Sequence, residues 1–168
     1  PAGGTTGQVL TKNSSTDYDV SWKSASDNYF YPETYGAVGD GVHDDRSAIN
    51  QAAAAASAAG GGVVRYRPGK TYLLGSYQVG TVLIKNYTGV SHVGDGPSTV
   101  LKVANGMNTV SNYYRVFFPQ NTTDVCNNML FKDFTIDFNG ANNGGFNYNN
   151  VGIGQYKGSN RSEERRVG

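Results

Sequence analysis

Short runs of branched and aromatic residues, divided by turn-forming residues, most restrict what this chain can fold into. Eight such runs follow residue 62, at 63–67, 71–74, 82–85, 90–93, 99–103, 115–118, 129–138 and 151–156. Asn, Gly and Pro stand between them, as in Pro68-Gly69, Asn105-Gly106 and Asn139-Gly140. These residues favour turns because they tolerate or fix unusual backbone angles. Many short strands with such corners predict an all-β fold, either a sandwich or a parallel β-solenoid.

The composition agrees with this prediction and excludes other classes of protein. Val outnumbers Leu by 17 to 6 among the 168 residues, and there are 12 Tyr and 7 Phe. Such side chains suit strands, so a helical bundle is excluded. A net charge of +1 does not fit a strongly basic nucleic-acid binder. No apolar run approaches the roughly 18 residues of a membrane span. A single cysteine, Cys126, forms neither an internal disulfide nor a zinc site, so we expect a small apolar filler and neither metal nor cofactor.

The two ends of the chain differ from the middle. Residues 161–168, R-S-E-E-R-R-V-G, are charged and follow a Gly-, Asn- and Tyr-rich stretch. The same string results when a common short-read sequencing adapter is translated in one frame, so we interpret it as an artefact; the alternative is an authentic charged tail. The first residue is Pro1 rather than Met, which suggests that the true N-terminus is missing.

One helix is predicted, over the alanine-rich residues 46–59. Asp44 or Asp45 is suited to accept hydrogen bonds from its first amides, and the following three glycines end it. Ile49 is its one large apolar side chain, and Ala52, Ala53 and Ala56 lie on the same side. We expect this thin face to lie close over a flat surface, such as the open end of a solenoid.

Residues 34–74 contain an ordered set of motifs: Gly36-Ala37, Gly39-Asp40-Gly41, Asp44-Asp45, Ala48-Ile49, Gly60 to Gly62, Pro68-Gly69 and Tyr72. This set resembles the start of the pectate-lyase-like superfamily domain, also called rhamnogalacturonase- or epimerase-like. Pro68 and Gly69 are adjacent here, whereas the family spaces them by one residue. Residues 94–101 and 134–140 resemble later turns of the same domain. The resemblance implies an all-β fold: the start of a right-handed parallel β-helix, with an N-terminal capping α-helix, over residues 29–160.

Residues 3–22 are similar to a segment of tail fibres and tailspikes of tailed bacteriophages, on the pattern G-Q-V-L-T-K-x-S…D-Y-D-x-x-W. The alternative is a generic hairpin that turns at 13–15. Residues 1–28 are therefore expected to be a tail-fibre-type β segment. The resemblance implies a homotrimer in the full-length protein, contacts with other phage tail proteins, and a place in the virion tail at the host cell surface. Nucleic acid is not an expected partner.

The two resemblances together imply a protein that binds, and depolymerises, bacterial surface polysaccharide, by hydrolysis or by β-elimination. Whether it is an enzyme stays open. One alternative is a non-catalytic structural or adhesive tail fibre that binds glycan. Another is a secreted pectate-lyase-like enzyme, against which the first 22 residues argue. In such proteins the cleft usually lies on later coils or between subunits, so we expect the catalytic residues beyond residue 160.

Two carboxylates are candidates for catalysis. Asp133 and Asp137 stand four apart on one presumed strand, so they would share a face and form a pair of glycosidase type. The alternative for Asp137 is a structural role in a turn or ladder. Asp40, Asp44 and Asp45 also cluster in sequence; we interpret them as turn and cap residues rather than as a metal site or an acid–base pair.

Other polar and aromatic residues have both a functional and a structural interpretation. His43 and His92 have no nucleophile motif beside them, and we expect surface or hydrogen-bonded histidines. Arg65 and Arg67 share one face of a presumed strand, where they would grip an acidic glycan or simply be solvated. Four tyrosines have two interpretations, stacking on sugar rings or packing inside the solenoid or at a subunit contact: Tyr113, Tyr114, Tyr148 and Tyr156.

Overall fold

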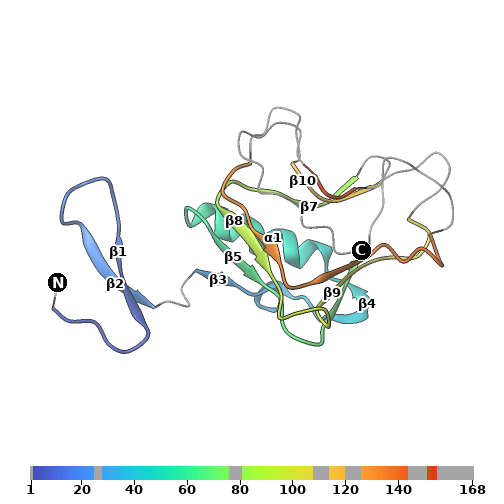
Figure 1. Cartoon of the computed structure of the whole chain (residues 1–168), viewed down its shortest axis with the longest axis horizontal. Coiled ribbons are helices and arrows are strands. Elements are labelled where there is room, and N and C mark those ends of the chain that lie inside the picture. The colour runs from blue at the N-terminus through green and yellow to red at the C-terminus, as the bar shows by residue number, and fades with distance from the viewer. Residues whose placement is uncertain are drawn as a thin grey trace.

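The computed structural model describes residues 2–24, 28–75, 81–107, 114–119, 126–143 and 151–154. The first part is an antiparallel hairpin of β1 (Gln8–Lys12) and β2 (Val20–Ser24), which stands apart from the body of the molecule in Figure 1. Leu10 and Trp22 are direct register partners and share one face of the hairpin. The Trp22 indole donates to the Ala2 carbonyl at 2.7 Å.

The body is a three-sided solenoid of parallel strands. One sheet contains β3 (Tyr29–Phe30), β5 (Gly62–Arg65), β8 (Val90–Val93) and β11 (Phe131–Lys132). A second contains β4 (Asp40–Asp44), β6 (Thr71–Leu74), β9 (Val100–Val103) and β12 (Thr135–Asp137). The third contains β7 (Thr81–Lys85), β10 (Tyr114–Phe118) and β13 (Val151–Ile153). This topology confirms a parallel β-helix and excludes the sandwich.

Within the described part of the chain, the first coil gives only β3 and β4, and each later coil gives one strand to each of the three sheets. Equivalent residues stack from coil to coil. Tyr72, Leu101 and Ile136 form one such inward row. In another sheet the inward row runs through Val64, His92 and Phe131. Along these rows the core is continuous, since Val64, Tyr72 and Leu101 are completely buried.

Residues 129–138 were predicted to form a single strand, but the structure has two strands there. β11 and β12 are separated by a bend at Asp133, whose φ is 59°. The carbonyl of Asp133 lies against Gly94 of the coil before: a Cβ on Gly94 would come within 2.5 Å of it. The sequence predicted one continuous strand because apolar residues lie on both sides of the bend. The bend itself involves a contact with Gly94 of the preceding coil, which sequence spacing does not reveal.

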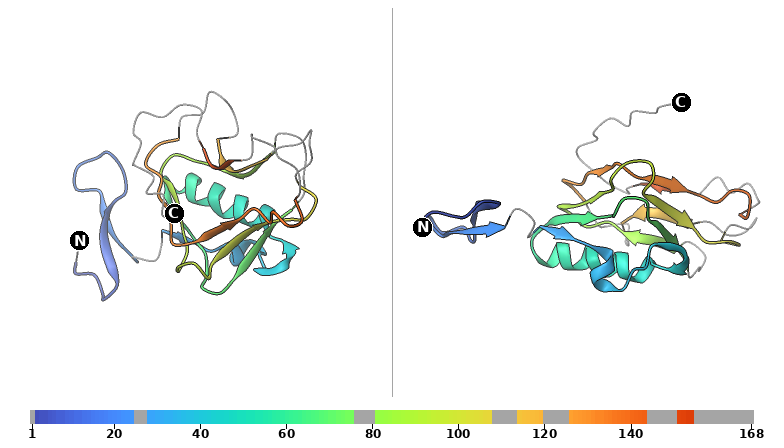
Figure 2. Two further views of the ribbon diagram at one scale, coloured as in Figure 1. Left: turned by 45° about the vertical axis from the view of Figure 1, so that its right-hand side comes forward. Right: turned by 90° about the horizontal axis from the view of Figure 1, so that it is seen from below.

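Helix α1 (Arg46–Ala58) lies across one end of the solenoid (Figure 2). Ile49, Ala52, Ala53 and Ala56 are completely buried, which confirms the predicted face. The Asn50 side chain also bonds to the edge strand β7: its Nδ2 donates to the Leu83 carbonyl at 2.7 Å, and its Oδ1 accepts from the Lys85 amide at 2.9 Å. The helix therefore covers apolar side chains and also satisfies the backbone of an exposed strand edge.

Asparagine side chains form hydrogen bonds from coil to coil at one corner of the solenoid. Asn139, with a φ of 55°, donates from Nδ2 to the Val103 carbonyl at 3.0 Å and to Oδ1 of Asn105 at 2.7 Å. Asn143 donates to the Ala104 carbonyl at 2.9 Å and accepts from the Met107 amide at 2.8 Å. These bonds join successive coils where the turns have no strand partners. Cys126 is buried, as predicted for an apolar filler.

Candidate functional site

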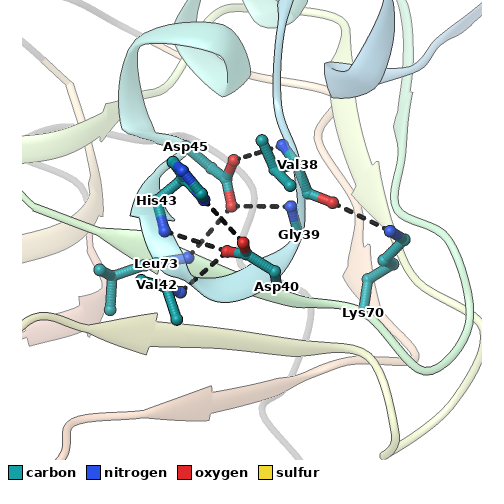
Figure 3. Close-up of polar contacts among 8 residues, drawn as sticks. All are labelled: Val38, Gly39, Asp40, Val42, His43, Asp45, Lys70 and Leu73. Atoms are coloured by element: carbon teal, nitrogen blue, oxygen red, sulfur yellow. Dashed lines mark hydrogen bonds and ion pairs between the residues drawn. The ribbon is translucent and has the colours of Figure 1, made fainter.

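Three carboxylates gather where β4 meets α1, and Asp45 is the most buried of them. Its side chain accepts hydrogen bonds from the amides of Val38 (2.7 Å), Gly39 (3.1 Å) and Leu73 (3.3 Å), as Figure 3 shows. Burial raises the pKa of this carboxyl, and the three N–H donors act against that shift. Asp45 is the N-cap residue of α1 by position, but its side chain makes no capping bond. The predicted capping role of its side chain is therefore wrong: the carboxylate ties the 38–39 turn to β6.

Asp44 provides the capping contact instead. Its Oδ1 accepts from the Arg46 amide at 3.0 Å, at the first residue of the helix, and from the Gly75 amide at 2.9 Å. A carboxylate here also interacts favourably with the positive end of the helix dipole. One of the two predicted cap candidates is thus confirmed.

Asp40 binds its own turn. Its Oδ1 accepts from the amides of His43 (3.0 Å) and Val42 (2.9 Å), and its Oδ2 lies 2.6 Å from Nδ1 of His43. The backbone N–H of His43, then that of Val42, and then the His43 ring hold the pKa of Asp40 well below its usual range. Figure 3 shows Asp40 and Asp45 bound to different amides. These contacts support the structural interpretation of Asp40, Asp44 and Asp45.

The catalytic candidates Asp133 and Asp137 do not share a strand. Asp133 lies in the bend between β11 and β12, beside the ammonium of Lys132 at 3.1 Å. Asp137 ends β12, and its Oδ1 accepts from the Asn139 amide at 2.7 Å. The expectation that strand alternation puts both on one face is therefore wrong. Asp137 instead has Lys102 of β9 as its register partner.

His92 is completely buried among aromatic rings, not at the surface. Its Nδ1 lies 2.8 Å from the hydroxyl of Tyr66, and its ring stacks on Phe131 with centroids 5.6 Å apart. No group among the described residues forms a hydrogen bond with its Nε2. Burial lowers the pKa of His92 to about 3. The ring is therefore neutral at pH 7, and only one of its nitrogens is satisfied.

The two arginines differ in their contacts. The Arg65 guanidinium forms an ion pair with Asp95 and donates to the Gly94 carbonyl at 2.8 Å. The Arg67 guanidinium lies over the ring of Tyr31, 4.4 Å from its centroid. The shared solvated face predicted for the pair is thus correct only for Arg67, which is exposed. Sequence spacing could not show this, because Asp95 is 30 residues from Arg65.

Several predictions fall outside the described residues. Tyr113, Tyr148 and Tyr156 lie there, as do the side chain of Tyr114 and residues 161–168. Among the residues that the structure does describe, no group of three or more His, Cys, Asp or Glu side chains could hold a metal ion. Within the same part of the chain, no helix is long and apolar enough to cross a membrane.

Stacked parallel coils with a helix at one end define a right-handed parallel β-helix of the pectin-lyase-like fold. Residues 33–162 match the family described as rhamnogalacturonase A/epimerase, pectate lyase-like, and the chain belongs to this family.

The similar proteins include a binding protein, an epimerase and a tailspike. The plasmin and fibronectin-binding protein A of Streptococcus pneumoniae (strain ATCC BAA-255 / R6) is 36% identical over 129 residues, 72% of this chain and 17% of that protein. The A-module of the Azotobacter vinelandii mannuronan C-5 epimerase AlgE6 is 32% identical, with a TM-score of 0.55 over 67% of this chain and 29% of that one. The tailspike of E. coli bacteriophage HK620, solved with a pentasaccharide, is 18% identical, with a TM-score of 0.57 over 79% of this chain and 25% of that one. The last likeness shows the fold alone. The chain thus spans less than a third of the length of each of these proteins.

Proposed function

We propose that this chain belongs to an extracellular protein that binds polysaccharide, and more specifically to a bacteriophage tailspike or tail fibre. Membership of the rhamnogalacturonase/epimerase family over residues 33–162 carries the first part. The mannuronan epimerase and the pentasaccharide-bound tailspike, both of this fold, agree with a glycan ligand.

The phage origin rests on residues 3–22 and their resemblance to tail-fibre segments. This segment forms the β1–β2 hairpin, where Leu10 is 50% and Tyr18 97% exposed. We propose that three copies pack the Leu10 face around an axis, since a short two-stranded hairpin is marginally stable alone. Other tail proteins would be further partners, with the virion tail at the host surface as the location.

We further propose that the protein depolymerises the polysaccharide that it binds. Asp137 and Asp133 are the carboxylates to test within this chain. Asp137 has Lys102 of the preceding coil as its register partner. In the full-length protein, Asp137→Asn and Asp133→Asn should be compared for release of reducing ends and of unsaturated sugar products. Loss of product with Asp137→Asn and retained glycan binding would support catalysis by Asp137; unchanged product from both variants would contradict a role for either.

The binding proposal is tested by titrating the folded chain with purified capsular and lipopolysaccharide glycans from candidate hosts. Saturable binding of at least one glycan is the expected result. Absence of binding to every bacterial glycan would contradict the proposal. A light-scattering measurement on the same sample reports the mass of the assembly.

A second candidate is a surface adhesin without chemistry, favoured by the 36% identity to the plasmin and fibronectin-binding protein A. An adhesive tail fibre that binds glycan without cleaving it is closely related to this alternative. Immobilised plasmin and fibronectin should be offered to the chain in parallel with glycans. Saturable binding of either protein, without any glycan binding, would favour the adhesin.

A further inference from the structure

Arg67 is an exposed arginine whose guanidinium is already positioned. It lies over the ring of Tyr31, 4.4 Å from the centroid. Within the described part of the chain no carboxylate forms an ion pair with it, whereas Arg65, two residues earlier, is bound to Asp95. Stacking on a ring holds the flat guanidinium in place and leaves its edge donors for another group.

An exposed tyrosine lies beside this stack. Tyr29 is 45% exposed, and its ring meets that of Tyr31 edge to face, with centroids 6.5 Å apart. Tyr31 directly follows β3 and its backbone is still extended, with φ −88° and ψ 126°, so both residues lie on the same side of the chain. The surface therefore combines an aromatic ring with a fixed cation.

Hydrogen bonds of the buried Tyr72 hold the backbone of Arg67 in place. The hydroxyl of Tyr72 accepts from the Arg67 amide at 3.0 Å and donates to Oε1 of Glu33 at 2.6 Å. Tyr72 is completely buried, so the segment that carries Arg67 has little freedom to move. Glu33 is a carboxylate behind this segment, and within the described part of the chain its Oε2 has no hydrogen-bond partner.

We propose that Tyr29, Tyr31 and Arg67 form a subsite for one acidic sugar unit. The inference rests on the proposed function of polysaccharide binding and adds the charge of the ligand. A guanidinium binds a sugar carboxylate through two parallel N–H donors, and a tyrosine ring packs on the apolar face of a pyranose. Arg67 supplies the first contact and Tyr29 the second.

The test uses the full chain and two tetrasaccharide probes: one of galacturonic acid, and its carboxyl-reduced neutral counterpart. Arg67→Gln should weaken binding of the acidic probe by roughly two- to fivefold, as expected for an exposed charge contact. Glu33→Gln should strengthen it, because it removes a negative charge while Tyr72 keeps an acceptor. Lys132→Gln is the matched control: it removes one cation from β11, a strand of the sheet that contains Tyr29, and the affinity should not change. The Nε–H signal of Arg67 in NMR spectra should shift only with the acidic probe.

The outcomes separate the two proposals. If the chain binds the neutral probe as well as the acidic one and the Arg67 variant changes nothing, the acidic subsite is refuted and polysaccharide binding stands. Equal weakening by Arg67→Gln and Lys132→Gln indicates general charge attraction and also refutes the subsite. If neither probe nor any bacterial glycan binds, both proposals fail.

Discussion

The side-chain amide of Asn50 donates to the Leu83 carbonyl at 2.7 Å and so takes the place of a neighbouring strand along the free edge of β7. We expect Asn50→Ala to lower the free energy of unfolding by about 2 kcal/mol, since the Leu83 carbonyl and the Lys85 amide lose their partner. Urea denaturation measures the change. Gln51→Ala, at the next, exposed helix position, should change stability by less than about 0.5 kcal/mol. Equal stabilities of the two variants would contradict the edge-capping role.

Asp45 and Asp44 should differ in their effect on stability. Asp45→Ala removes the acceptor of three backbone amides, and we expect a loss of about 3 kcal/mol. Asp44→Ala removes an exposed cap and should cost about 1 kcal/mol. Both are measured by urea denaturation at pH 7. An Asp45 variant that loses no more than the Asp44 variant would show that the 38–39 turn does not depend on this carboxylate.

Stability should fall in mild acid because of His92. Its pKa is about 3 in the folded chain against an ordinary value of 6.5, so below pH 6.5 the unfolded chain binds a proton that the folded chain does not. Each pH unit between 6.5 and 3 then removes up to about 1.4 kcal/mol, and the contribution is fully present above pH 6.5. Denaturation at pH 7.5 and pH 5 should therefore differ by about 2 kcal/mol.

The matched pair for this test is Tyr66→Phe alone and with His92→Phe, since the first change removes the hydroxyl that would otherwise lose its partner. The single variant should keep the loss of stability between pH 7.5 and pH 5, and the double variant should lack most of it. The same loss in both would assign the acid sensitivity to other groups.

The hairpin should determine the assembly. We expect Leu10→Glu to convert a trimer into monomers, because it places a charge on the face that carries Leu10 and Trp22. Thr11→Glu puts the same charge on the opposite face and should leave the trimer intact. Light scattering reports both masses. Monomers in the unmodified protein would refute the trimer, and a trimeric Leu10 variant would move the interface elsewhere.

Sequence reasoning located most strands because the corners between them have local causes. The ends of β6 and β8 agree with prediction to the residue, and turn residues lie on either side of each. The periodicity of apolar residues could not decide between a β-sandwich and a β-solenoid. It depends on pairings such as Val64 with His92, which are 28 residues apart.

The candidate site was predicted less well, for the same reason. Asp45 looked like a simple cap because a cap is a local pattern, whereas its partner Leu73 is 28 residues away. The bend at Asp133 depends on Gly94 of the previous coil. His92 is buried because the rings of Tyr66, Phe117 and Phe131 surround it. These residues are 25 or more positions away in sequence, so no local pattern around the histidine reveals them.

The contact between Asn50 and β7 also gives the solenoid a direction of growth. Where α1 occupies the edge of β7, no further strand can be added, while β11, β12 and β13 form the opposite edges of the three sheets in the described part of the chain. The closed end is encoded first in the chain, so it leaves the ribosome before the coils that stack on it. Each new coil can thus template on a finished one during synthesis, and the polarity of translation matches the polarity of assembly.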